Sequence, residues 1–190
     1  MRPGLIWSAC WLVLMGKAQG AERVLHSFGS PLRGAAPVAG LILDSDGNLY
    51  GTTPEGGKSG LGVVYKVDPG GNETVLHSFS GPDGANPQSA VTRDQAGNFF
   101  GTTINGGASG YGTVFKLDAN GSDTVLYSFT GGTDGANPYA GVIRDVHGNL
   151  YGTTETGAHG GVVYKLDTSG HETVLHTSPG ARTGLCRTRA

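Results

Sequence analysis

Short apolar stretches separated by glycine-rich polar stretches run along most of this chain. In the middle of the sequence they read "TVLHSF" (74–79), "SAVTRD" (89–94), "NFFGTT" (98–103) and "GTVFKLD" (112–118). Their mixture of β-branched and aromatic residues is typical of strands. No sustained apolar period of about 3.6 residues is visible there, so we expect helix to be nearly absent.

Alternation within these stretches predicts which side chains share a face. In a regular strand, successive side chains point to opposite sides. "TVLHSF" would therefore place Val75, His77 and Phe79 on one face, and Leu76 and Ser78 on the other.

The pattern is an internal repeat. "GNLYGTT" at 47–53 recurs as "GNFFGTT" at 97–103 and as "GNLYGTT" at 148–154, and the valines of the "VLH" or "VLY" motif step by 51, 50 and 49 residues. Four short strands in a unit of about 50 residues are typical of a propeller blade. The sequence thus predicts an all-β, propeller-like array of about three four-stranded antiparallel blades. Since closed propellers use about four to eight blades, we expect the array to be incomplete or open.

The predicted organisation has three parts. Residues 1–20 are a signal peptide, 21–176 are the repeat domain, and 177–190 are an irregular tail. The repeats of the middle part are placed at about 22–72, 73–122 and 123–171, with a partial copy at 172–176. The tail "TSPGARTGLCRTRA" stands where a further repeat is expected. This favours a truncated or frame-shifted repeat protein over a genuine tail.

Glycine is unusually abundant, at 35 of 190 residues, against an average share of about 7%. Together with Asn, Asp and Pro it marks the stretches between the strands as tight turns. The glycines do not recur every third residue, which excludes collagen.

The N-terminal stretch indicates export. A basic start at Arg2 is followed by an apolar run from Leu5 to Met15 and the small residues "AQG", which is a secretory pattern with cleavage after Gly20. Localisation is therefore predicted as secreted or cell-surface, with no membrane span after cleavage. Cleavage would leave Cys186 as the single cysteine, so no intramolecular disulfide is expected. It would also change the formal charge from −2 to −4 and leave no basic block, which disfavours nucleic-acid binding.

These motifs, "GNLYGTT", "GTVFKLD", "TVLYSF" and "DGANP", resemble the choice-of-anchor tandem-repeat proteins, the GloVer-type repeat of bacterial exported proteins. The resemblance covers Glu22 to about His176. It implies an exported, propeller-like array, often with a C-terminal sorting or anchoring segment. It implies no activity, cofactor or catalytic residue. This chain shows fewer repeats and no recognisable anchor pattern.

Recurring acids are the first candidate chemistry. They stand at strand ends before glycine-containing turns: Asp44, Asp94, Asp145, Asp68, Asp118 and Asp167. Paired carboxylates could hydrolyse glycosides. Acids repeated in every unit are better explained by turns in which the carboxylate accepts backbone N–H groups.

Two motifs look like ligand-binding loops. "DSDGN" at 44–48, with Glu55 at the twelfth position, looks like the start of a calcium loop, but the flanking helices of such a loop are missing. "GTTPEGGKSGLGVVYK" at 51–66 looks like a phosphate-binding loop, but the glycine is one residue out of place and a strand follows. We interpret the first as a turn and Lys58 of the second as a solvated loop charge.

The histidines share one repeat position. His26, His77 and His176 align, and Tyr127 fills the same place in the remaining copy. Tyrosine can replace histidine in packing but seldom as a metal ligand. The sequence therefore favours packing, and we expect no metal site. The "DGANP" loops at 83–87 and 134–138 are candidate ligand loops, since loops at one end of a propeller bind ligands.

The leading functional hypothesis is a structural or binding scaffold at or outside the cell surface, with no catalytic residue and no cofactor. Its partner would be a carbohydrate or a protein, and open strand edges would permit self-association. Two alternatives stay open. One is a truncated fragment of a larger propeller protein, and the other is a propeller-type hydrolase acting on extracellular polysaccharide.

Overall fold

The computed structural model describes residues 23–29, 32–158 and 160–179 of the chain. All regular structure in this part is β-strand, and no helix is present there, as the sequence pattern predicts. No described segment therefore forms a helix of the length and apolar character that a membrane crossing requires. The predicted signal peptide and residues 180–190 of the predicted tail lie outside the described residues.

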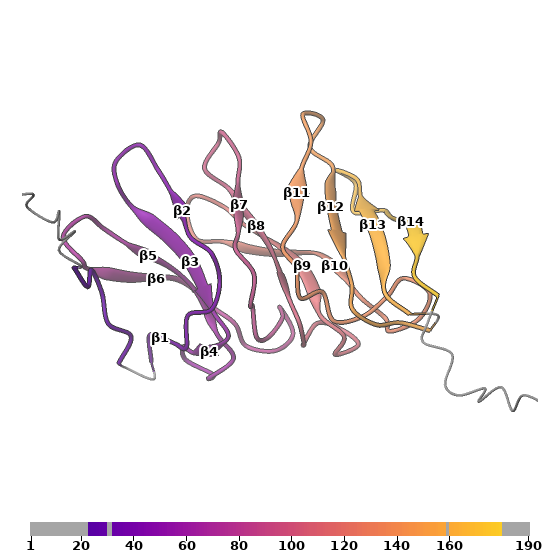
Figure 1. The fold of residues 1–190 in the computed structure, drawn as a ribbon, viewed down its shortest axis with the longest axis horizontal. Coiled ribbons are helices and arrows are strands. Elements are labelled where there is room, and N and C mark those ends of the chain that lie inside the picture. Colours follow the sequence, from indigo (N-terminus) through magenta and orange to yellow (C-terminus); the bar gives the residue numbers. More distant parts are fainter. Residues whose placement is uncertain (1–22, 30–31, 159, 180–190) are drawn as a thin grey trace, which may run out of the picture.

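Three antiparallel four-stranded sheets follow one another along the chain (Figure 1). In each sheet, every strand pairs with the one before it in the sequence of that sheet. The first sheet consists of β2 (Ile42–Leu43), β3 (Leu49–Thr53), β5 (Val63–Val67) and β6 (Glu73–Ser78). The second consists of β7 (Thr92–Arg93), β8 (Phe99–Thr103), β9 (Thr113–Leu117) and β10 (Asp123–Ser128). The third consists of β11 (Ile143–Arg144), β12 (Leu150–Thr153), β13 (Val162–Leu166) and β14 (Glu172–Thr177).

The sheets form an open, propeller-like array. In Figure 1 they lie side by side in sequence order, from indigo to yellow, with the first and third sheets at opposite ends. A small additional sheet pairs β1 (Gly34–Ala35) with β4 (Glu55–Gly56) beside the first blade. The predicted fold, an all-β open array of three four-stranded blades, is confirmed.

The sheets also show where a blade begins within the repeat. Each sheet ends with the "TVLHSF" type of strand, so the blades are offset from units counted from that motif. The copy of this motif at 23–28, "RVLHSF", forms no strand, so the prediction of a strand for every copy of the repeat motif is wrong there. In the other copies this strand pairs with a preceding "GVVYK" or "GTVFK" strand.

The central strand β9 of the second sheet is buried on both faces. In β9, Phe115 packs into the apolar cluster shared with the first sheet, which includes Phe79 and Tyr50. The neighbouring Val114 packs into the cluster shared with the third sheet, which includes Tyr164. The core of the protein therefore lies between the sheets. Full burial of such side chains stabilises the fold by about 1.5–3 kcal/mol each.

The last strand of each sheet contains a β-bulge that changes its alternation. In the first sheet, Val75 lies opposite Tyr65 and His77 lies opposite Val64, with Leu76 as the extra residue. Because Tyr65 and Val64 point to opposite faces, Val75 and His77 do as well. The prediction that Val75, His77 and Phe79 share one face is therefore wrong. The bulge turns His77 toward the second sheet.

The glycine of the "DGA" motif lies against the last threonine of a "GTT" motif where one sheet meets the next, and this contact explains both motifs. Gly84 has a φ of 128°, and a Cβ at this position would lie 2.4 Å from Oγ1 of Thr103. Gly135 stands against Thr154 in the same way. Only glycine allows the loop between two sheets to lie this close to the threonine of the following sheet.

Candidate functional site

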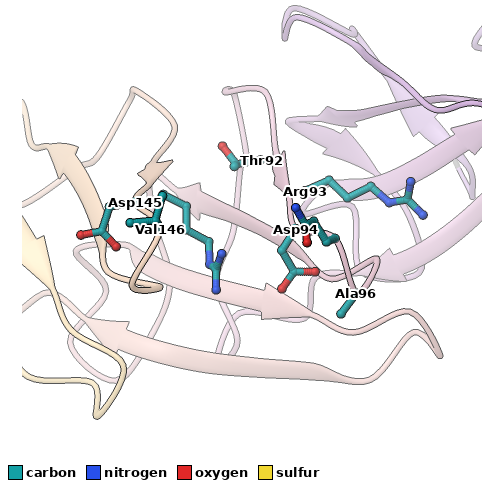
Figure 2. Close-up of a pocket in the computed structure, with 8 residues that line it drawn as sticks. Thr92, Arg93, Asp94, Ala96, Asp145 and Val146 are labelled. Atoms are coloured by element: carbon teal, nitrogen blue, oxygen red, sulfur yellow. The ribbon is translucent and has the colours of Figure 1, made fainter.

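A pocket of about 550 Å³ lies between the second and third sheets. It is lined by residues 92–96, at the end of β7, and residues 144–146, at the end of β11. Figure 2 shows Asp94 and Asp145 at the ends of these two neighbouring strands, with Thr92 and Val146 beside them. The volume lies within the usual range of ligand pockets, about 300–1,000 Å³.

Two arginines of the pocket are held over aromatic rings. The guanidinium carbon of Arg93 lies 5.4 Å from the ring centre of Tyr50 and 5.5 Å from that of Phe99. That of Arg144 lies 5.6 Å from the ring centre of Phe100. These are cation–π distances. Both positive charges are therefore positioned by residues of the packed sheets. The Arg93 guanidinium reaches over Tyr50 of the first sheet, and Figure 2 shows its side chain directed away from Asp145, so Arg144 is the arginine that offers its remaining N–H groups to a ligand between the second and third sheets.

The two acids of the pocket are turn residues that stay ionised. A hydrogen bond from the Asn149 side chain is the main cause that lowers the pKa of Asp145 to about 2. Burial raises the pKa of Asp94, but hydrogen bonds from Asn98 and the charge of Arg144 outweigh it and lower the pKa. A glycosidase acid needs a raised pKa. This pair therefore supplies hydrogen-bond acceptors and disfavours hydrolysis at this pocket.

The other recurring acids behave in the same way, which confirms their interpretation as turn residues. Oδ1 of Asp44 accepts the N–H groups of Asp46 and Asn48, at 3.0 and 2.9 Å. Its Oδ2 accepts Asn48 Nδ2 and the Tyr50 hydroxyl. Equivalent bonds to backbone N–H groups are made by Asp68, Asp94, Asp118, Asp145 and Asp167. The carboxylate of "DSDGN" thus closes its own turn, as the sequence interpretation holds.

The Gly-Lys-Ser segment is also structural. It connects β4 to β5, the backbone N–H of Lys58 donates to Ser78 Oγ at 2.7 Å, and the Lys58 residue is exposed. A strand, not a helix N-terminus, follows, so the phosphate-loop geometry is missing here.

The "DGANP" loops lie at the junctions between sheets, and most of their polar groups contact the protein itself. Asn86 adopts a left-handed backbone with φ of 57°. Its N–H donates to Leu61 O at 2.8 Å and its Nδ2 to Pro54 O at 2.9 Å, both in the first blade. Its carbonyl accepts Ile104 N–H from the second blade. These loops therefore hold neighbouring blades together, and the candidate ligand pocket lies elsewhere.

Three polar positions recur at every junction. One is the histidine or tyrosine of the "VLH" or "VLY" motif, one begins the "DGANP" or "RGAAP" loop, and one is the acid that opens the last strand of the sheet that follows. We call each set a junction triad. The triads are His26–Arg33–Glu73, His77–Asp83–Asp123 and Tyr127–Asp134–Glu172.

The first and third triads differ in charge. In the first, His26 Nε2 lies 2.9 Å and Arg33 lies 3.9 Å from Oε2 of Glu73, whose side chain is fully buried. In the third, the Tyr127 hydroxyl donates to Asp134 Oδ2 at 3.1 Å. Burial and the charge of Asp134 raise the pKa of Glu172.

The aromatic role predicted for this repeat position is confirmed in three of the four copies, whereas His176 is exposed. His77 and Phe79 pack edge to face at 4.8 Å, as do His26 and Phe28, and Tyr127 packs against Phe129 at 5.1 Å. The carboxylates beside these rings were not predicted, because the members of each triad come from different repeats.

Comparison with known proteins finds a matching family model and several similar solved structures. The family model for the Gloeobacter/Verrucomicrobia repeat matches residues 12–188. A search of the curated proteins finds no match. Among solved structures, a gluconolactonase of Xanthomonas campestris is similar over 74% of this chain and 46% of its own, with 18% identity and a TM-score of 0.47.

Two further structures are similar to a comparable degree. A putative gluconolactonase is similar over 73% of this chain and 47% of its own length, with 17% identity and a TM-score of 0.46. Dipeptidyl peptidase 4 of Porphyromonas gingivalis is similar over 72% of this chain and 18% of its own length, with 17% identity and a TM-score of 0.45. This chain thus spans less than half the length of each of these structures.

Proposed function

Because the chain belongs to the Gloeobacter/Verrucomicrobia repeat family, we propose that it is an exported binding scaffold. Its pocket between the second and third sheets would take a carbohydrate. Export is proposed from the signal-peptide pattern of residues 1–20. An extracellular position would bring the pocket into contact with polysaccharides of the cell surface.

One observation carries the ligand class: an open pocket in which the Arg144 guanidinium lies near two ionised aspartates, Asp94 and Asp145. Sugar hydroxyl groups both donate and accept hydrogen bonds, so they match a surface that offers both kinds of group. The guanidinium group of Arg144 only donates, and the carboxylates of Asp94 and Asp145 only accept. Although turn bonds use part of the acceptor capacity, each carboxylate oxygen can accept a further hydrogen bond.

The test is glycan binding by the full-length protein. A glycan array identifies a ligand, and calorimetry then compares wild type with Arg144→Gln and with Lys58→Gln. Arg144→Gln removes a donor from the pocket and should weaken binding about tenfold, which corresponds to about 1.4 kcal/mol. Lys58→Gln removes the same charge at an exposed loop outside the pocket and should leave affinity unchanged. No binding to any glycan, or equal effects of the two substitutions, would refute this proposal.

Export is tested separately. When the full chain is expressed in a bacterial host, we expect secreted or surface material whose mass corresponds to loss of residues 1–20. Material that stays in the cytoplasm with its N-terminus intact would contradict it.

A further inference from the structure

The second junction triad brings a histidine and two aspartates together from three segments. His77 comes from β6 of the first sheet, Asp83 from the loop that follows, and Asp123 from the start of β10 in the second sheet. One ring nitrogen of His77 and one carboxylate oxygen from each aspartate all lie within 4.8 Å of one another. His77 Nε2 and Asp83 Oδ2 are 2.8 Å apart.

Two of these side chains are held in place by their surroundings. The bulge at Leu76 turns His77 toward the second sheet, and its ring packs edge to face on Phe79. Oδ1 of Asp83 accepts both the backbone N–H and the hydroxyl of Ser80, each at 2.9 Å. Because these bonds orient the carboxylate, Oδ2 points to the space beside His77. Supporting hydrogen bonds of this kind are typical of metal ligands.

The third side chain lacks a partner. Oδ1 of Asp123 is buried and has no hydrogen-bond partner among the described residues. A buried carboxylate without compensation is costly, so this position favours a positively charged group.

The other junctions carry different groups, although buried carboxylate oxygens of Glu73 and Glu172 also lack a hydrogen-bond partner among the described residues. In the first, Arg33 stands in the place of Asp83 and brings a positive charge to Glu73. In the third, the Tyr127 hydroxyl donates directly to its aspartate. Of the three junctions in the described part of the chain, the second alone combines an imidazole with two carboxylates.

We propose that His77, Asp83 and Asp123 bind a divalent first-row transition metal ion, with Zn²⁺ as the best match. One imidazole nitrogen and two carboxylate oxygens form a ligand set that zinc accepts, and solvent completes the coordination of three-ligand sites. Entry from solvent is open, because the side chains of His77 and Asp83 remain 16% and 19% exposed. The bound ion joins the first and second sheets.

This site revises the expectation drawn from the repeat. The replacement of histidine by Tyr127 argues against a metal at that position in every copy. The same replacement does not argue against a metal ion at the second junction, where Asp83 and Asp123 complete the ligand set of His77. The other two junctions then act as natural controls within the same chain.

The test uses the full-length protein freed of metal by EDTA and dialysis. Calorimetric titration with ZnCl₂ and thermal melting with and without Zn²⁺ are compared for wild type, His77→Tyr and His26→Tyr. His77→Tyr copies the residue found at the third junction. We expect it to lose one equivalent of bound zinc and the rise in Tm that zinc produces. His26→Tyr should keep both.

Two further measurements keep the outcome decisive. If His77→Tyr fails to fold, Asp83→Asn replaces it, because the amide oxygen can still accept the bonds from Ser80. We expect its zinc affinity to fall by about a hundredfold or more. Co²⁺ should give a visible absorption band in wild type that His77→Tyr lacks, and Ca²⁺ should not displace Zn²⁺ from the imidazole. No zinc binding by wild type, or equal stoichiometry in wild type and in the folded variants, would overturn the proposal.

Discussion

Val114 and Val163 occupy the same position in consecutive sheets, yet Val114 is fully buried and Val163 is 37% exposed. Each is the first residue of the "VF" or "VY" pair in the central part of a sheet, on the face that points to the next blade. Val114 meets the third sheet there, whereas no described sheet covers Val163.

This difference predicts unequal costs for the same substitution. Val114→Ala removes two buried methyl groups and should lower the free energy of unfolding by about 2 kcal/mol. Val163→Ala removes the same groups from a partly solvated site and should cost less than about 1 kcal/mol. Urea denaturation of the two full-length variants measures both values. Equal costs would mean that Val163 is covered in solution, for example by a second copy of the chain.

The contact between Gly84 and Thr103 predicts a large effect of one added methyl group. Gly84→Ala places a Cβ 2.4 Å from Thr103 Oγ1 and should cost about 3 kcal/mol from strain and overpacking. Gly110 is the control, since it also has a positive φ, 83°, but an added Cβ would meet nothing within 4 Å. Gly110→Ala should cost only the backbone strain, about 1 kcal/mol. Thermal and urea unfolding distinguish the two, and similar values would rule out the Thr103 contact as the cause.

Asn86 allows a hydrogen bond to be separated from backbone strain. Asn86→Ala should cost about 1–2 kcal/mol, because the bond to Pro54 O is lost and alanine tolerates the left-handed backbone less well. Asn86→Gly removes the same bond but relieves the strain, so it should cost less. Ala36 adopts the same backbone in the first copy, with φ of 55°, so we expect both variants to fold. If Asn86→Gly is less stable than Asn86→Ala in urea, strain in the left-handed backbone does not determine the stability of variants at this position.

The turn aspartates predict how stability depends on pH. The pKa of Asp44 and of Asp145 is lowered to about 2 in the folded protein, against about 3.9 in an unfolded chain. Their stabilisation is therefore complete above pH 4 and is lost as the pH falls toward 2. Melting temperatures measured from pH 7 to pH 2 should fall less steeply over this window in Asp145→Asn than in wild type. An unchanged slope would show that the carboxylate bonds persist in the unfolded state or do not form.

Much of this fold could be predicted from the sequence because the repeat presents the same local rules three times. Turn chemistry at Asp44 and its equivalents, the strand pairs around "GNLYGTT" and the open array all follow from short-range patterns. The bulge at Leu76 could not be predicted, because one extra residue leaves the apolar pattern nearly unchanged while reversing the faces of the residues beyond it.

The candidate sites were harder to predict than the fold. The second triad joins residues 77, 83 and 123, which belong to two different repeats and lie close only when the sheets stack. The pocket likewise requires Asp94 and Asp145 to lie at neighbouring strand ends. Comparison of the histidine position across the repeat copies indicates packing. It does not reveal that, among the described junctions, only the second places an imidazole beside two carboxylates.

The loop after each last strand has a consequence for how such a chain can change in length. Residues 80–87 leave the first sheet, lie against Thr103 of the second and thereby belong to the boundary between them. A duplicated segment of about fifty residues would carry one complete sheet together with one complete boundary. Genetic gain or loss of whole units therefore leaves every remaining boundary intact, whereas a cut inside a unit would separate a sheet from the loop that its neighbour needs.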